Sequence, residues 1–216
     1  MADPVTLEPL ESVHGEPFQQ LYSIYAASIT PREQKPEAWI RAMVASPDYR
    51  VYLTKAAGRV LGFSILFLRP IEGFSLLEYM AVAPEQRSKG LGSTLFQQTV
   101  ELSVAPHGAK LPVLLEIDSD REASSDQAMR TRRERFYRRL GCAKIAGLRY
   151  LMPLQGLGPA PEMDLMTYWA ESPGRVSRDA LKRWLQTIYR DVYHCSPDDP
   201  RIGQMLEPLP DPVLVQ

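Results

Sequence analysis

The chain has 216 residues, of which 44% are hydrophobic and 24% are charged, and its formal net charge is −1. This composition supports a folded core and argues against wholesale disorder, while the near-zero charge argues against a nucleic-acid partner. All apolar runs are shorter than the roughly 18 residues of a membrane span, and the N-terminus lacks the pattern of a signal peptide. We therefore expect a cytoplasmic protein with no membrane or nucleic-acid partner, whose two cysteines are reduced thiols.

The first 45 residues predict one strand and two helices. Residues 5–10 suit a strand, and residues 16–27 place large apolar side chains on one helical face. Two prolines bracket a loop before a second helix over 37–45, for which we expect Trp39, Ile40 and Met43 to point inward.

Residues 50–83 contain successive strand-like runs separated by short turns, which predicts an antiparallel meander. Strand-like runs at 50–56 and 59–68 flank Ala57-Gly58, which suits a hairpin turn. A further strand covers 76–83, a helix is expected from about 92 to 104, and a buried strand covers 112–118. Because strand, helix and strand imply a crossover, we expect these last two strands to form a parallel pair.

A glycine-containing turn separates the strand at 76–83 from its helix. It reads Gln86-Arg87-x-x-Gly90-x-Gly92, which fits neither a P-loop nor a dinucleotide fingerprint. Glycines let the backbone approach a ligand closely, and a helix start offers unpaired N–H groups and a partial positive charge. These properties predict a phosphate-binding site.

The turn, with its preceding strand and following helix, resembles the acyl-CoA signature of the GCN5-related N-acetyltransferase (GNAT) superfamily. The resemblance covers residues 5–169 and implies an α/β fold (an α+β mixed sheet) whose central strands splay apart and are flanked by helices. It implies that the turn holds the diphosphate of acetyl-CoA and that the strand binds the pantetheine arm. The implied coenzyme-binding residues are Met80, Ala81, Val82, Arg87, Ser88, Lys89, Gly90, Leu91, Gly92 and Ser93.

The implied activity is direct transfer of acetyl from acetyl-CoA to an amine of a small molecule or peptide. Two alternatives stay open: transfer of another acyl group, such as succinyl or propionyl, and a non-catalytic acyl-CoA-binding or regulatory module. The acceptor amine is not identified by the sequence, because fold does not fix function.

A second motif, Phe136-Tyr137-x-x-x-Gly141, resembles the end of another helix of the family and falls within a helix predicted over 129–140. A neutral phenol can protonate the departing thiolate, so we assign Tyr137 as general acid; the alternative is a packing role. Arg130 stands where the family often has Asn. Arg130 and Arg133 share the face of Tyr137, and we hypothesise that one of them meets a coenzyme phosphate; the alternative is a solvated arginine face.

The attacking amine must lose a proton, and two carboxylates interrupt apolar strands. Glu78 is our first candidate base, with Glu116 close behind and Asp118 third. The alternative for both glutamates is a structural carboxylate paired with arginine. By the logic of an oxyanion hole, the backbone N–H of Val82 would polarise the thioester carbonyl.

In the family, the region between the first two helices borders the acceptor pocket. Arg32, Glu33 and Trp39 are therefore candidates for acceptor binding, as is Asp118; a helix-capping loop and a core Trp are the alternative. The three histidines lack ligand spacing, so we expect no metal.

The C-terminal part is rich in proline. We expect strands at 142–145, 150–154 and 162–169, a polar loop at 118–128 and a Gly/Pro loop at 155–161. An amphipathic helix follows over 177–193 with Ser177 as N-cap, and residues 198–216 read as an extended surface tail. The expected domains are a transferase domain over 1–170 and an extension over 171–216 packed on it. That extension could cover the acceptor pocket, support a homodimer or simply pack on the sheet.

Overall fold

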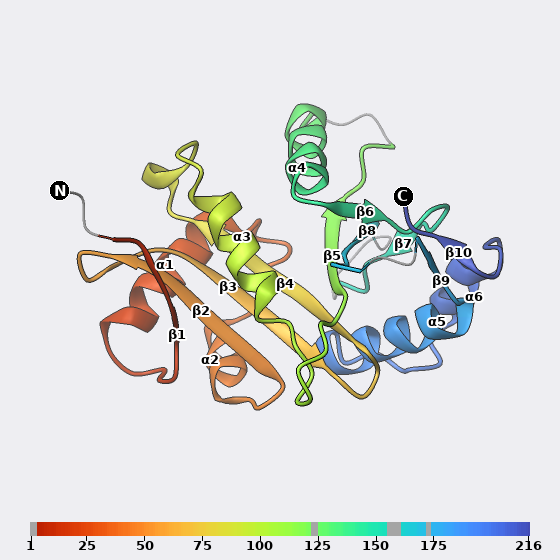
Figure 1. The fold of residues 1–216 in the computed structure, drawn as a ribbon, viewed down its shortest axis with the longest axis horizontal. Coiled ribbons are helices and arrows are strands. Elements are labelled where there is room, and N and C mark those ends of the chain that lie inside the picture. Colours follow the sequence, from red (N-terminus) through yellow and green to blue (C-terminus); the bar gives the residue numbers. More distant parts are fainter. Residues whose placement is uncertain (1–3, 122–124, 155–160, 172–173) are drawn as a thin grey trace. The chain divides into compact units, whose positions relative to one another are not determined.

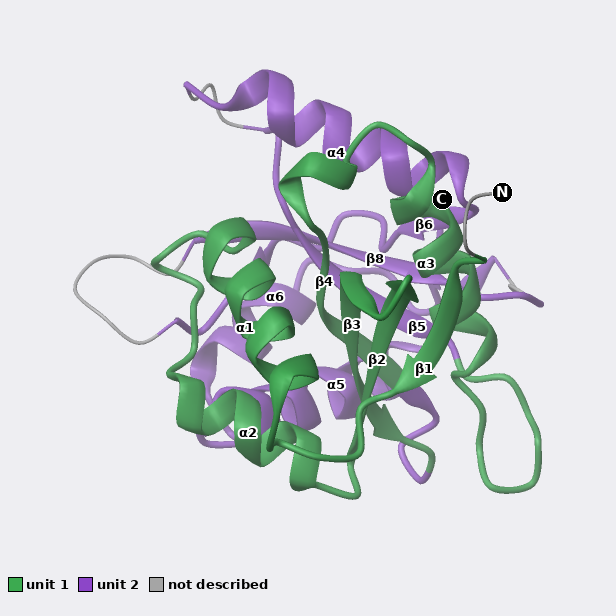
Figure 2. Cartoon of the chain, turned by 90° about the vertical axis from the view of Figure 1, so that its left-hand side faces the viewer, with its two compact units in different colours: residues 1–70, 75–111 green, residues 71–74, 112–216 purple. Residues whose placement is uncertain are grey.

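The computed structural model describes residues 4–121, 125–154, 161–171 and 174–216 (Figure 1). The chain forms two compact units, coloured separately in Figure 2. Unit 1 comprises residues 1–70 and 75–111, and unit 2 comprises residues 71–74 and 112–216. Among the described helices, none is both long and apolar enough to cross a bilayer.

Unit 1 contains the expected meander. Strands β1 (Thr6–Pro9), β2 (Tyr49–Ala56), β3 (Arg59–Arg69) and β4 (Phe74–Val82) are neighbours in that order. β2 pairs antiparallel with β1 and with β3. The hairpin turn between β2 and β3 falls at Ala57 and Gly58, which both have positive φ, as the sequence predicts.

Three helices pack on these strands. α1 (Glu16–Ser28) and α3 (Leu91–Glu101) contact β3, and α2 (Glu37–Ala45) contacts β2. The core between α1, α2 and the strands contains Phe18, Leu21, Tyr25, Ile40, Met43, Phe63 and Ile65, all buried. The expected inward position of Trp39 is wrong, because its side chain is 38% exposed. The buried face of α2 is formed by Ile40 and Met43. Trp39 lies next to this face on the helix and not within it.

Unit 2 is built around β8 (Glu162–Tyr168). β5 (Val113–Asp118), β6 (Cys142–Lys144) and β7 (Tyr150–Leu151) all pair antiparallel with it. Met163, Leu165 and Met166 of β8 are almost completely buried. Both cysteines are free thiols, as expected, and Cys142 is buried on β6.

The helix α4 (Gln127–Arg139) lies between β5 and β6 in the chain. It ends as predicted, with Gly141 in the left-handed region at φ 92°. No residue of α4 is fully buried, so Phe136 and Leu140 are only partly covered rather than in a core. Apolar burial therefore contributes little to the position of this helix.

The amphipathic helix of the C-terminal part is confirmed. It consists of α5 (Arg178–Thr187) and a π-helical turn, η2 (Ile188–Val192). The hydroxyl of Ser177 accepts a hydrogen bond from the Ala180 N–H at 3.2 Å, as an N-cap does. The five side chains predicted for its inner face are all buried: Leu181, Trp184, Leu185, Ile188 and Val192.

The expected surface tail over 198–216 is wrong. Residues Pro200–Leu206 form α6, and Val213–Leu214 form β10, which pairs with β9 (Arg175–Val176). Asp199 caps α6 by accepting from the Arg201 N–H at 3.0 Å, and proline is well tolerated at the first position of a helix. The buried side chains of this segment have near-helical spacing: Ile202, Met205, Leu206 and Leu209.

The two predicted loops are described only in part. Residues 122–124 of the polar loop and 155–160 of the Gly/Pro loop lie outside the described residues. In the described part of the polar loop, Arg121 reaches β8 through hydrogen bonds to Glu162 at 2.6 Å and to Asp164 at 2.6 Å.

Candidate active site

The glycine-containing turn leads from a short 3₁₀ turn, η1 (Pro84–Gln86), into α3. Ser88 and Gly90 have positive φ values of 64° and 82°, and Gly90 is the N-cap of α3. The Gly90 carbonyl accepts from the amides of Ser93 and Thr94. Among the described residues, no acceptor is recorded for the amides of 88–92. Residues 88–90 are exposed, so this turn presents free N–H groups to solvent at a helix start.

Arg87 ties the turn to the rest of unit 1. Its guanidinium donates to the Val82 carbonyl at 3.4 Å and to the Ser28 hydroxyl at 3.0 Å. Lys89 donates to the side chain of Gln86 at 3.2 Å. Arg87 thus holds the turn against the end of β4 and the end of α1.

The strand residues expected to bind pantetheine lie at the end of β4. Ala81 is buried, and Met80 and Val82 are half-buried. A Cβ atom at Gly62 of β3 would lie 2.9 Å from the Ala81 carbonyl oxygen. Only glycine at this position lets β3 approach β4 so closely.

Tyr137 lies one turn from the end of α4 and is half-buried. Its ring packs edge-on against Phe136, with 5.1 Å between centroids. Burial raises the pKa of the Tyr137 phenol to about 12, and the nearby charge of Arg133 opposes that shift. The phenol therefore holds its proton throughout the neutral range.

The two arginines on the Tyr137 face already have partners. Arg130 donates to Asp126 at 3.0 Å and to the Ser119 carbonyl at 2.9 Å. Arg133 donates to Asp118 at 2.5 Å. These contacts place Asp118, at the end of β5, in an ion pair and link the start of α4 to that strand end. A phosphate contact by either arginine stays a prediction.

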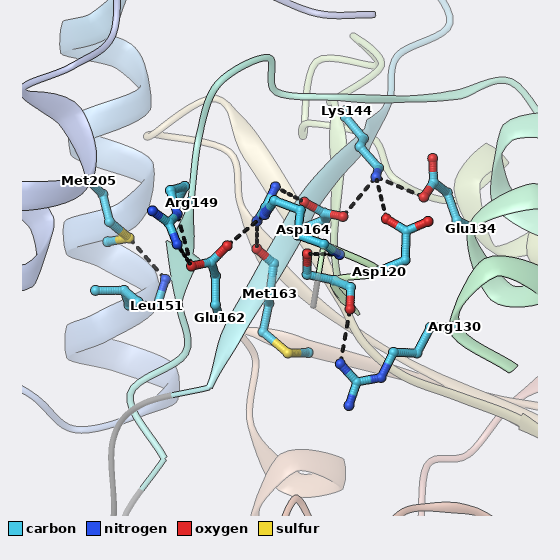
Figure 3. Close-up of polar contacts among 12 residues, drawn as sticks. Asp120, Arg130, Glu134, Lys144, Arg149, Leu151, Glu162, Met163, Asp164 and Met205 are labelled. Atoms are coloured by element: carbon cyan, nitrogen blue, oxygen red, sulfur yellow. Dashed lines mark hydrogen bonds and ion pairs between the residues drawn. The ribbon is translucent and has the colours of Figure 1, made fainter. Parts of the chain in front are cut away.

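Charged residues attach α4 to its neighbouring strands (Figure 3). The ammonium of Lys144 on β6 lies 2.7 Å from Glu134 of α4 and 2.7 Å from Asp164 of β8. Asp120 is farther, at 3.9 Å. The carboxylates of Asp120, Glu134 and Asp164 lie close enough together to hold a cation, and the ammonium of Lys144 provides one.

The pKa values in this cluster reflect the pairing. Burial alone would raise the pKa of Glu134, but hydrogen bonds from Lys144 and Arg138 outweigh burial and leave it below its ordinary value. Burial likewise would lower the pKa of Lys144, but hydrogen bonds to Asp164 and Glu134 raise it. Both groups are therefore charged at neutral pH.

Glu78, the first candidate base, is engaged through both oxygens. Lys35 lies 2.5 Å from Oε1, and the Tyr49 hydroxyl donates to Oε2 at 2.9 Å. The side chains of Glu78 and Lys35 are 3% and 13% exposed. Burial, together with the negative charge of Glu78, raises the pKa of Tyr49. This geometry is that of a structural ion pair, but the partner is Lys35 and not the expected arginine.

Glu116, the second candidate base, is engaged in the same manner by two phenols. Tyr150 of β7 donates to Oε1, and Tyr193 donates to Oε2 at 2.6 Å. Burial and the Glu116 charge raise the pKa of Tyr150. Next to this pair, the hydroxyl of Tyr189 donates to the Leu151 carbonyl. The C-terminal segment thus supplies polar partners to β5 and β7.

The candidate acceptor residues lie on the loop between α1 and α2 and on α2. Arg32 is exposed, and the Glu33 carbonyl accepts from the Tyr79 hydroxyl at 3.1 Å. The ammonium of Lys35 lies 5.8 Å from the centroid of the exposed Trp39 ring, within the range of a cation–π contact. The exposure of Trp39 rules out the core role that was its alternative.

Sequence reasoning missed the partners of the two glutamates, which are Lys35, Tyr49, Tyr150 and Tyr193. Their separations from Glu78 and Glu116 run from 29 to 77 positions, and no local pattern reports contacts at that distance. The only available signal was chemical, because a buried carboxylate requires a partner.

Comparisons with known proteins identify the class of fold. A family profile described as an acetyltransferase (GNAT) domain matches residues 47–141. The match contains both the glycine turn and the Tyr137 motif. No curated protein sequence matches the chain.

Solved structures with this fold share little sequence with the chain. A protein described as a GNAT-family acetyltransferase from Bacteroides thetaiotaomicron has 18% identity and a TM-score of 0.70, covering 87% of this chain and 98% of that one. A GNAT acetyltransferase from Elizabethkingia anophelis with acetyl-CoA bound has 16% identity and a TM-score of 0.51, covering 76% and 96%. The ribosomal-protein-S18-alanine N-acetyltransferase from Escherichia coli has 18% identity and a TM-score of 0.53, covering 78% and 98%.

Residues 47–141, which are 44% of the chain, thus resemble a GNAT acetyltransferase domain, and the mixed α/β fold is the fold of the GNAT acetyltransferases with solved structures. The first of these neighbours covers 87% of the chain. The structural match to this neighbour must therefore extend beyond residue 170 of the chain.

Proposed function

We propose that the chain is an N-acetyltransferase that moves an acetyl group from acetyl-CoA directly to an amine. The observation that carries this proposal is the turn over residues 88–92, whose backbone amides have no acceptor among the described residues and of which residues 88–90 are exposed. Such amides at the N-terminus of α3 suit the diphosphate of the coenzyme. The acetyl-CoA found in one structural neighbour supports the same choice of coenzyme.

In the proposed reaction, the amine nitrogen attacks the thioester carbonyl carbon and the C–S bond breaks. The sulfur leaves as a thiolate and takes the phenolic proton of Tyr137. Because the pKa of Tyr137 is about 12, donation to a free thiol of pKa near 8.5 would be uphill by roughly 5 kcal/mol. We therefore propose that Tyr137 hydrogen-bonds to the sulfur while the C–S bond breaks, that its proton then passes to the thiolate, and that solvent returns a proton to the resulting phenolate, which offsets the uphill transfer.

The proton of the attacking amine needs a separate acceptor. Glu78, Glu116 and Asp118 stay the candidates, acting directly or through water. Each already holds a hydrogen-bond donor, so each would have to exchange or share a partner in order to accept a proton. The Val82 N–H is the proposed donor to the developing oxyanion.

For the acceptor, the exposed ring of Trp39 and the adjacent Arg32 and Glu33 are the proposed contacts. An aromatic face that already attracts the Lys35 ammonium can attract a cationic amine in the same manner. This favours an acceptor, a small molecule or a peptide, that carries a cationic amine.

The proposal is tested by mixing the full chain with acetyl-CoA and a panel of primary amines and measuring the release of free CoA thiol. Turnover with at least one amine, together with coenzyme binding by calorimetry, supports it. Tight binding of acetyl-CoA without turnover on any amine would favour the regulatory module. No heat on titration with acetyl-CoA or CoA would exclude both.

A further inference from the structure

The arginines of α4 divide into two sets. The helix has six arginines and one glutamate, a net charge of +5. Arg130 and Arg133 pair with aspartates, and Arg138 pairs with Glu134 at 2.7 Å. Within the described part of the chain, Arg132, Arg135 and Arg139 have no ion-pair partner, and all three are exposed.

The unpaired set borders an open hollow of about 910 Å³, whose described lining belongs to α4 alone. The lining residues are Ala128, Thr131, Arg132, Arg135, Arg138 and Arg139. We call this surface the arginine face. It combines guanidinium groups with the methylene stems of the arginines and two small side chains, so it offers apolar area as well as charge.

The arginine face is separate from the surface of α4 that holds Tyr137. At 3.6 residues per turn, its six residues lie roughly 100° to 180° around the helix from Tyr137, whereas Arg130 and Arg133 lie within about 40° of it. The arginine face therefore has no part in the chemistry proposed for Tyr137, and its unpaired charges call for another explanation.

We propose that the arginine face binds an acidic peptide segment of a partner protein. Arg132, Arg135 and Arg139 form a stripe about 10 Å long, which suits two or three carboxylates in succession, each able to accept a forked hydrogen bond from a guanidinium. Nucleic acid is disfavoured because proteins that bind it are usually basic, whereas this chain has a net charge of −1 and a pI near 6.3.

The test uses fluorescein-labelled deca-glutamate as the probe and measures its fluorescence anisotropy as the full chain is added. The test variant carries Arg132→Gln, Arg135→Gln and Arg139→Gln. The control variant carries Arg59→Gln, Lys182→Gln and Arg183→Gln, which removes the same charge from exposed positions elsewhere. Thermal melts establish that both variants are folded.

We expect the wild type and the control variant to bind the peptide, with affinity that falls as salt is added. The test variant should bind at least about tenfold more weakly, and its acetyl-transfer rate should be unchanged. Equal loss of binding in the two variants would overturn the proposal, because general charge would then explain the binding. It is also overturned if a labelled ten-nucleotide RNA binds more tightly than the peptide and loses its binding only in the test variant.

Discussion

The hydroxyl of Tyr193 donates a hydrogen bond to Glu116 at 2.6 Å, joining two residues 77 positions apart in the chain. Tyr150 donates to the other oxygen, so both oxygens of the Glu116 carboxylate accept a hydrogen bond. The C-terminal segment is therefore part of the polar structure of unit 2.

Replacing Tyr193 by Phe should lower the free energy of unfolding by about 1.5 to 3 kcal/mol, as expected for a hydrogen bond to a charged group. Urea denaturation measures this change. Tyr52→Phe is the matched control, because no partner is recorded for the Tyr52 hydroxyl among the described residues. If the two variants are equally stable, the Tyr193 contact contributes nothing.

Tyr137→Phe should reduce kcat by about 10² or more, the usual contribution of a general acid, and should leave the KM for acetyl-CoA nearly unchanged. The pKa of Tyr137 is about 12 because the phenol is buried. The proton is present below that value, so the wild-type rate should show no loss from Tyr137 ionisation up to about pH 10. Stopped-flow kinetics across pH would check both points, and an unchanged kcat would limit Tyr137 to packing.

Gly90→Ala tests the turn. Gly90 has φ 82° and a Cβ there would meet no atom within 4 Å, so the expected cost in stability is only the backbone strain of about 1 to 2 kcal/mol. Gly58 has φ 73° and equally open surroundings, which makes Gly58→Ala a matched control.

Both glycine variants should lose similar stability in thermal melts. Only Gly90→Ala should weaken binding of CoA in calorimetry, by about tenfold, which corresponds to about 1.4 kcal/mol. If the Gly58 variant loses the same affinity, the turn at Gly90 has no special role in coenzyme binding.

Glu78→Gln separates a base from a structural ion pair. In a structural role, the loss of charge leaves the buried Lys35 ammonium uncompensated and costs about 3 kcal/mol or more. A double variant, Glu78→Gln with Lys35→Met, should then recover both stability and kcat. If Glu78 is the base, stability recovers but kcat stays low, and the pH profile of kcat/KM loses its acid limb.

The Lys144 cluster should make stability depend on pH. Glu134 has a lowered pKa in the folded chain, so its contribution is present above its ordinary value of 4.5 and is lost as pH falls through the lowered value. Lys144 has a raised pKa, so its contribution is present below 10.5 and is lost as pH rises beyond it.

The corresponding measurement compares urea unfolding at pH 7 and pH 3.5. Wild type should lose more stability between these values than Lys144→Met, because the variant has no pair to lose. Lys110→Met is the control, since its pair with Glu101 is more exposed and worth little. Equal pH dependence in wild type and Lys144→Met would contradict an ionic attachment of α4.

Local signals in the sequence were sufficient for most elements. The hairpin at Ala57-Gly58, the helix end at Gly141 and the N-cap at Ser177 were all predicted, because turns and caps depend on residues within a few positions of one another. The glycine turn was also placed correctly between β4 and α3, and Ser88 and Gly90 have positive φ there. The helix α6 was not predicted, because residues 198–216 contain four prolines and too short an apolar pattern to indicate a helix.

The amino-acid sequence by itself determined the resemblance to a GNAT domain, the position of the glycine-containing turn and the helix that holds Tyr137. Only the tertiary structure decided that Glu78 lies against Lys35, that Glu116 lies between two tyrosines and that Trp39 is exposed. The physical reason is that periodicity and turn chemistry act between near neighbours, whereas the partner of a buried charge is selected by packing between segments that are distant in the chain.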